Sequence, residues 1–259
     1  MKHIQKKYLF EDRLTELLND KNLNYQEFDA KKIDRDILKK NYKTHNVIME
    51  TSEKEKIFAF IHNHHGKHIV IPMPDFTLVY YDFAYKLNIQ RKEFTKEIFE
   101  KLSEDSSFTE VNSNLLYNFY GYSSSCIINL FTCLESFINS LLGSDKEFVD
   151  RKNNRTEIYN REQIQQYLSF LDKLKKVLPQ FYNKNFFLNS TPTNQHIIKL
   201  KDLRDKIIHT KSDSTGDSQI EIFKLLLNFK YEETFASVSK LINFYKDSYI
   251  VECPCDKDF

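Results

Sequence analysis

The chain has 259 residues, of which 41% are hydrophobic and 14% aromatic, so it can bury a sizeable core in one large domain or two small ones. It contains only 4 glycines and 5 prolines, which excludes a loop-rich or disordered chain. The formal net charge of +1 does not indicate a uniformly basic nucleic-acid-binding protein, so any contact with nucleic acid must come from a local cluster of basic residues.

The first residues, Met1 to Tyr8, are followed by charged residues and lack the apolar segment of a secretory signal. No later stretch reaches the ~18 uncharged apolar residues that a membrane span needs. The 4 cysteines are too few for a disulfide framework. We therefore expect a cytoplasmic protein with no membrane partner.

Residues 1–105 are expected to form a small N-terminal α+β region whose role the sequence does not indicate. Apolar residues at helical spacing predict a helix over 8–18. Pro72 and Pro74 interrupt the pattern further along, and a helix is expected again over 91–102.

Two β-rich runs in this region, 56–61 and 68–71, flank a polar segment. They predict a β-hairpin that turns near Gly66, because glycine readily adopts the positive φ that tight hairpin turns require. A further strand over 46–49 is expected to pair with this hairpin.

The predicted turn carries a cluster of histidines: His62, His64, His65 and His68. Neutral imidazoles are suitable ligands for zinc, copper or nickel, which would make the protein a metalloenzyme. No carboxylate or cysteine ligand stands beside them in the sequence, and short histidine-rich runs are more often polar loop tips than metal sites. We expect no metal site and no cofactor.

A polar and acidic run at 103–107 marks the expected boundary, and 106–259 is predicted to be a helical domain. Four helices are predicted from apolar spacing, over 114–142, 161–178, 218–229 and 232–245. The helix over 114–142 is expected to be interrupted near Gly121 and 123–125, and Pro179 is expected to end the helix over 161–178. The fold class expected is mainly α, with a C-terminal up-and-down helical bundle beside the smaller N-terminal region.

One more helix carries the residues of greatest chemical interest. Thr191 and Pro192 mark its start, and its apolar residues recur at steps of three and four, at Ile197, Leu200, Leu203 and Ile207. Arg204, Asp205 and His209 then lie in its last turns. Asp205 stands one turn before His209 and is expected to accept a hydrogen bond from the imidazole.

Glu135 lies on the apolar face of an earlier helix, among Ile128, Phe131, Ile138 and Leu142. An ionised carboxylate on such a face is costly without a cationic partner, and Arg204 is the expected one. Two interpretations follow. Glu135 orients Arg204 towards a phosphate, or the two residues form a structural bridge and His209 only ends its helix.

The pattern Arg204-Asp205-x-x-x-His209 resembles the signature of HEPN-domain ribonucleases, in which a histidine follows an arginine by four to six positions. The segment 130–142 is similar to an earlier long helix of that family, with its acidic position at Glu135. The two pieces occur in the family's order, and the resemblance covers roughly residues 108–250.

The resemblance implies a helical bundle that dimerises and cleaves RNA without a metal ion. Paired sites would place two copies each of Arg204 and His209 in one composite active site. Many HEPN proteins are toxins or abortive-infection effectors, which implies an antitoxin or another inhibitor as a further partner. Other members have lost catalysis and only bind RNA or nucleotides, or serve as protein scaffolds, and this alternative stays open.

Basic residues near the motif are the expected RNA contacts: Lys199, Lys201, Lys206 and Lys211. A second basic cluster at Lys173, Lys175 and Lys176 could also follow a phosphate backbone, but a solvated helix face is the more usual explanation of such a run.

Overall fold

The computed structural model describes residues 3–8, 35–43, 46–50, 56–104, 110–210 and 215–254. Contacts divide the chain into two compact units, which we call the sheet unit (Lys6–Leu78) and the helical unit (Met1–Gln5 with Val79–Phe259). The division between them falls inside helix α3 (Phe76–Glu104), whereas the sequence suggested a boundary near residue 105.

The sheet unit contains three antiparallel strands in the order β1 (Asn46–Glu50), β2 (Lys56–His64) and β3 (Lys67–Pro72), with a short helix α2 (Arg35–Asn41). The turn between β2 and β3 has positive φ at both His65 and Gly66, as a two-residue hairpin turn requires. The predicted hairpin and its third strand are confirmed. The helix predicted over 8–18 lies outside the described residues, apart from Tyr8.

Helix α3 begins at Phe76, fifteen residues before the expected start at residue 91. The two prolines therefore precede the helix closely, and the Asp75 carboxylate caps its start by accepting a hydrogen bond from the Leu78 amide at 3.2 Å. Helix α4 (Glu110–Ser140) matches the predicted long helix but is continuous. The expected interruption is wrong, because Gly121 stays helical and the Ser124 hydroxyl bonds back to the Tyr120 carbonyl at 2.7 Å.

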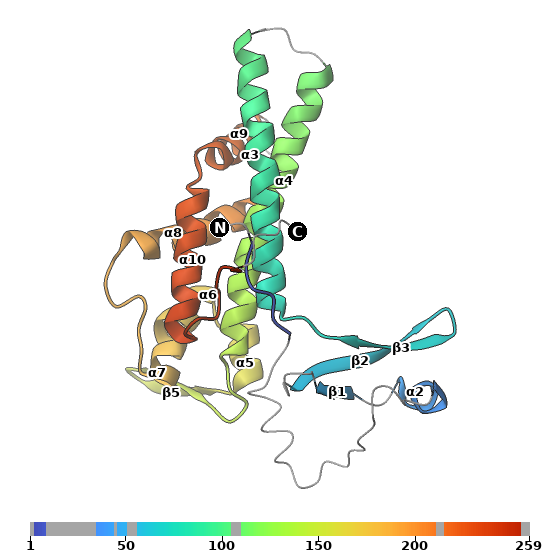
Figure 1. Ribbon diagram of the computed structural model, residues 1–259. Helices are drawn as coiled ribbons and strands as arrows, with labels where there is room; N and C mark the ends of the chain where they lie inside the picture. The colour runs from blue at the N-terminus through green and yellow to red at the C-terminus, as the bar shows by residue number, and fades with distance from the viewer. Residues whose placement is uncertain are drawn as a thin grey trace. The chain divides into compact units, whose positions relative to one another are not determined.

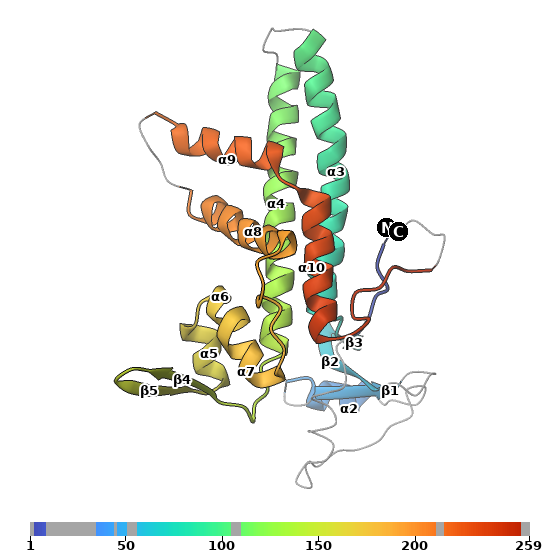
Figure 2. The ribbon, with the colours of Figure 1, turned by 90° about the vertical axis from the view of Figure 1, so that its left-hand side faces the viewer.

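In the helical unit, α3 and α4 lie side by side, and α10 (Tyr231–Tyr245) packs along them (Figure 1). Helices α8 (Pro192–Ile208) and α9 (Asp217–Asn228) lie across α4 instead (Figure 2). The unit is thus mainly helical as expected, but its helices do not all run up and down. Its core consists of fully buried aromatic and aliphatic side chains, among them Phe119, Leu130, Phe137 and Ile197.

The segment between α4 and α8 differs most from expectation. It contains an unpredicted hairpin of β4 (Phe148–Lys152) and β5 (Arg155–Tyr159). The single helix expected over 161–178 is broken at Leu168, whose backbone is extended. It is replaced by four short pieces: α5 (Arg161–Tyr167), α6 (Phe170–Asp172), the π-helix η2 (Lys173–Val177) and α7 (Leu178–Tyr182). Pro179 lies in the first turn of α7 rather than ending a helix.

The two ends of the described chain meet in the helical unit. Ile4 forms an antiparallel bridge with Glu252, and the Gln5 amide donates to the Val251 carbonyl at 2.9 Å. None of the described helices combines the length and the apolar character required to cross a membrane.

Candidate functional site

Helix α8 holds the sequence motif, and it begins where the sequence predicts. The Thr191 hydroxyl accepts a hydrogen bond from the Asn194 amide at 3.2 Å, and Pro192 occupies the first turn. The predicted apolar face is buried at Ile197, Leu200 and Leu203. This burial fixes the rotation of α8 about its axis, so Arg204 faces α4 at the edge of the core.

Arg204 and Glu135 form the expected pair across α4 and α8. The distance from Arg204 Nη2 to Glu135 Oε2 is 3.4 Å, and Arg204 Nη1 lies 2.9 Å from Asp205 Oδ1. The guanidinium carbon also lies 4.7 Å from the centre of the Phe131 ring. Three contacts thus hold the guanidinium plane, while 27% of the Arg204 side chain stays exposed and N–H donors remain for a ligand.

Asp205 holds Arg204 and Lys201 rather than the histidine. Its Oδ2 accepts from Lys201 Nζ at 2.8 Å, and its Oδ1 accepts from Arg204. Within the described residues no hydrogen bond joins its carboxylate to the His209 ring, so the expected orienting contact is absent there. His209 follows the last residue of α8; its backbone amide donates to the Asp205 carbonyl at 2.9 Å, and its side chain is exposed.

The protonation of Asp205 gives a first prediction. Burial opposes its ionisation, but the hydrogen bonds from Lys201 and Arg204 outweigh burial, and the pKa of the carboxyl lies below its ordinary value of 3.8. Ionised Asp205 therefore stabilises the fold at neutral pH, and this contribution is lost as the pH falls through the lowered pKa. We expect Asp205→Asn to lower the free energy of urea unfolding near pH 7 and to lower it less at about pH 3. An equal loss at both pH values would contradict this origin of the shift.

The four lysines expected to contact RNA differ in their surroundings. Lys199 is exposed on α8. Lys201 pairs with Asp205 and, at 3.5 Å, with Asp202, and Lys206 reaches Glu221 of α9 at 2.7 Å. Lys211 lies outside the described residues.

Two residues near the Arg204–Glu135 pair, Phe131 and Lys173, were not identified as site residues from the sequence. Phe131 was assigned to the apolar face of its helix, but one of its ring faces also supports Arg204. Lys173 was placed in a basic run expected to be solvated; instead it is only 9% exposed, while Lys175 and Lys176 are exposed. The π-helix that turns Lys173 inward has no clear signature in the sequence.

The histidines of the sheet unit lie around the β2–β3 turn. The ring centres of His64 and His65 are 4.4 Å apart, and the His68 ring packs on Tyr42 with 4.9 Å between the ring centres. Across the described ranges, no group of three or more histidine, cysteine, aspartate or glutamate side chains is arranged to hold a metal ion.

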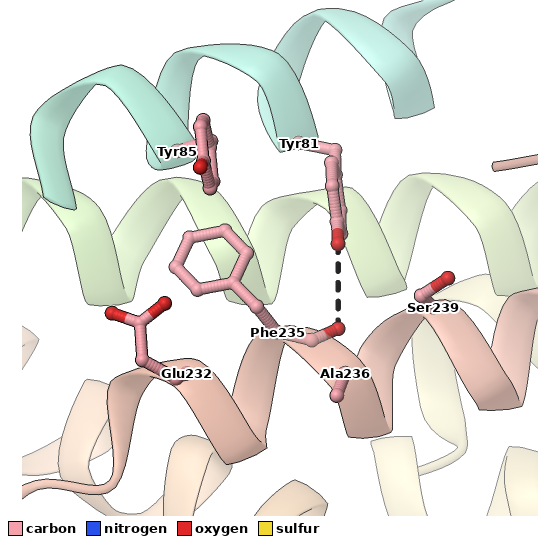
Figure 3. A pocket seen from close by; sticks show the side chains of 6 residues that line it. All are labelled: Tyr81, Tyr85, Glu232, Phe235, Ala236 and Ser239. Carbon is pink, nitrogen blue, oxygen red and sulfur yellow. Dashed lines mark hydrogen bonds between the residues drawn. The ribbon is translucent and has the colours of Figure 1, made fainter. Parts of the chain in front are cut away.

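A cavity of about 330 Å³ lies between α3 and α10. Figure 3 shows Tyr81 and Tyr85 of α3 facing Phe235 of α10, with Glu232 at one end. Tyrosine hydroxyls are protonated at neutral pH, and burial raises the pKa of both residues further, so neither is prepared to act as a base. The Glu232 carboxylate already accepts from Lys92 at 2.8 Å and from Asn88 at 2.9 Å. These contacts join the two helices, so we assign the cavity a structural role.

No family model, no curated protein and no solved structure matches this chain.

Proposed function

We propose that the protein is a metal-independent endoribonuclease of the HEPN type, with Arg204 and His209 as its catalytic residues. The observation that carries the proposal is the arginine clamp: Glu135, Asp205 and Phe131 hold the Arg204 guanidinium in one orientation, and the exposed His209 directly follows the same helix. A fixed guanidinium with free N–H donors is suited to a phosphate, whose oxygens it can bind in pairs.

RNA cleavage by this route needs a base for the ribose 2′-hydroxyl, a positive charge beside the phosphorus and an acid for the leaving 5′-oxygen. A histidine can supply the base or the acid, because its pKa lies near neutral pH. Arg204 supplies the charge, since the phosphorane gains negative charge as the 2′-oxygen attacks. The 2′-oxygen bonds to phosphorus and the 5′-oxygen leaves with a proton, which gives a 2′,3′-cyclic phosphate and a 5′-hydroxyl.

One chain supplies one His209, so the second proton transfer calls for another copy of the protein. We propose a homodimer in which two copies of α8 complete a composite site. Exposed apolar side chains at the ends of α8 and α9, Ile208 and Ile220, support this arrangement. The Lys206–Glu221 ion pair holds these two helix ends together. A two-fold interface would use the same patch on both copies.

We also propose that the ribonuclease acts as a toxin or in phage defence, which rests on the resemblance to HEPN proteins. An uninhibited ribonuclease would damage its own cell, so the proposal includes an antitoxin or another inhibitor as a partner. The alternative is a dimer that binds RNA or a nucleotide, or serves as a scaffold, without cleaving.

The test is to incubate the purified protein with a single-stranded RNA and with DNA of the same sequence, each with and without excess EDTA. We expect cleavage of the RNA and none of the DNA, because DNA lacks the 2′-hydroxyl nucleophile. RNA that is bound but stays intact would favour the non-catalytic alternative. Cleavage that EDTA abolishes would contradict the proposed chemistry.

A further inference from the structure

Lys173 is a buried cation directed at the same helix that carries Glu135. Its ammonium donates to Asn139 Oδ1 at 3.4 Å and to the Gln165 carbonyl at 3.1 Å. It begins the π-helix η2, whose wider turn lets Leu174 and Val177 pack in the core beside it. The lysine therefore points at α4 and away from solvent.

Glu135 stands one helical turn before Asn139 on α4, the residue that Lys173 contacts, and it pairs with Arg204 on α8. Burial lowers the pKa of Lys173, and the charge of Glu135 acts in the opposite direction. Glu135 is thus the carboxylate that compensates this buried ammonium.

Stability of the fold does not by itself explain a charge at this position. A buried ammonium loses its hydration, and an apolar side chain of similar length would avoid that cost. The lowered pKa of Lys173 also shows that its charge is a cost to the fold, because the folded state then binds the proton less tightly than the unfolded chain does. The π-helix that places the lysine is a local irregularity of the kind often found at functional sites.

We propose that Lys173 is a positioning residue of the Arg204 site: it compensates the charge of Glu135, so that the Arg204 guanidinium stays available to the phosphate of RNA. The contact from Arg204 to Glu135 is long, at 3.4 Å, and involves one nitrogen. Glu135 is 39% exposed, so without the ammonium its charge would be balanced only by water and Arg204, and a closer ion pair with Arg204 would compete with the phosphate. This inference rests on the proposed function for its ligand.

The test is a double-mutant cycle with Lys173→Met and Glu135→Gln, singly and together. Two quantities are measured: affinity for 2′-O-methyl RNA, which lacks the free nucleophile, and the single-turnover cleavage of ordinary RNA. We expect Lys173→Met alone to weaken RNA affinity about tenfold. The same change in the Glu135→Gln protein should have little further effect, because no carboxylate then remains to be compensated. Lys176→Met is the matched control; that lysine is exposed in the same π-helix and pairs with Asp172 at 2.8 Å.

Urea unfolding of all variants separates this role from a structural one, and we expect Lys173→Met to stay folded. Equal losses of affinity with and without Glu135 would overturn the inference, as would a Lys173→Met protein with unchanged affinity. If Lys173→Met weakens RNA affinity only when Glu135 is present, but the wild type does not cleave RNA, the ribonuclease proposal would be overturned and the role of Lys173 in RNA binding would be supported. A folded wild type that binds no RNA would overturn both.

Discussion

Replacing His209 with alanine is expected to lower the rate of RNA cleavage by about 10²- to 10⁴-fold, which is the usual contribution of general acid–base catalysis. The side chain is exposed and lies beyond the last residue of α8, so its loss should leave the fold almost unchanged. The measurement is the single-turnover cleavage rate of wild type and His209→Ala in EDTA, with thermal unfolding of both.

His64→Ala is the matched control for His209→Ala, because His64 is also exposed but lies in the sheet unit. It should cleave at the wild-type rate. If His209→Ala retained full activity, this histidine would only end its helix, and the catalytic assignment would have to be abandoned. If it failed to unfold cooperatively, a structural role would be favoured instead.

Replacing Arg204 with lysine is expected to lower the cleavage rate by about 10²- to 10³-fold, the usual loss when one group that stabilises transition-state charge is removed. Lysine keeps the positive charge beside Glu135 but has no planar fork to bind two phosphate oxygens or to lie flat on Phe131. We therefore expect the loss mainly in the maximal rate, with a smaller change in RNA affinity.

Arg155→Lys tests whether any arginine-to-lysine change has this effect. Arg155 is exposed on β5 and pairs with Glu157 at 2.9 Å, so its replacement should leave cleavage unchanged. Full activity in Arg204→Lys would contradict the role assigned to the planar guanidinium, because lysine retains the charge but not the two parallel N–H donors.

Local patterns predicted the parts of the fold that depend on local physics. The apolar spacing and the Thr191 cap located α8, and Gly66 located the hairpin turn, because both signals lie within a few residues of the feature. The Glu135–Arg204 pair was also predictable, since a carboxylate on an apolar face requires a cation.

Features that depend on tertiary packing were not predictable in this way. The hairpin of β4 and β5 has no glycine to mark its turn. The break at Leu168 lies within a stretch whose residue pattern indicates helix on both sides of it. Lys173 belongs to a run of lysines that indicates solvent exposure, yet it begins the π-helix η2 and is buried. Asp205 was assigned to His209 by its spacing, yet Lys201 stands at the same separation on its other side and binds it.

The chemical ends of the RNA fragments show whether the 2′-hydroxyl is the nucleophile. After incubation of the wild-type protein with a defined RNA in EDTA, mass spectrometry of the fragments identifies the chemical groups at each new end. We expect a 2′,3′-cyclic phosphate or its hydrolysed monophosphate on one fragment and a 5′-hydroxyl on the other. Fragments with a 5′-phosphate and a free 3′-hydroxyl would contradict it, because water and not the 2′-hydroxyl would then have attacked the phosphorus.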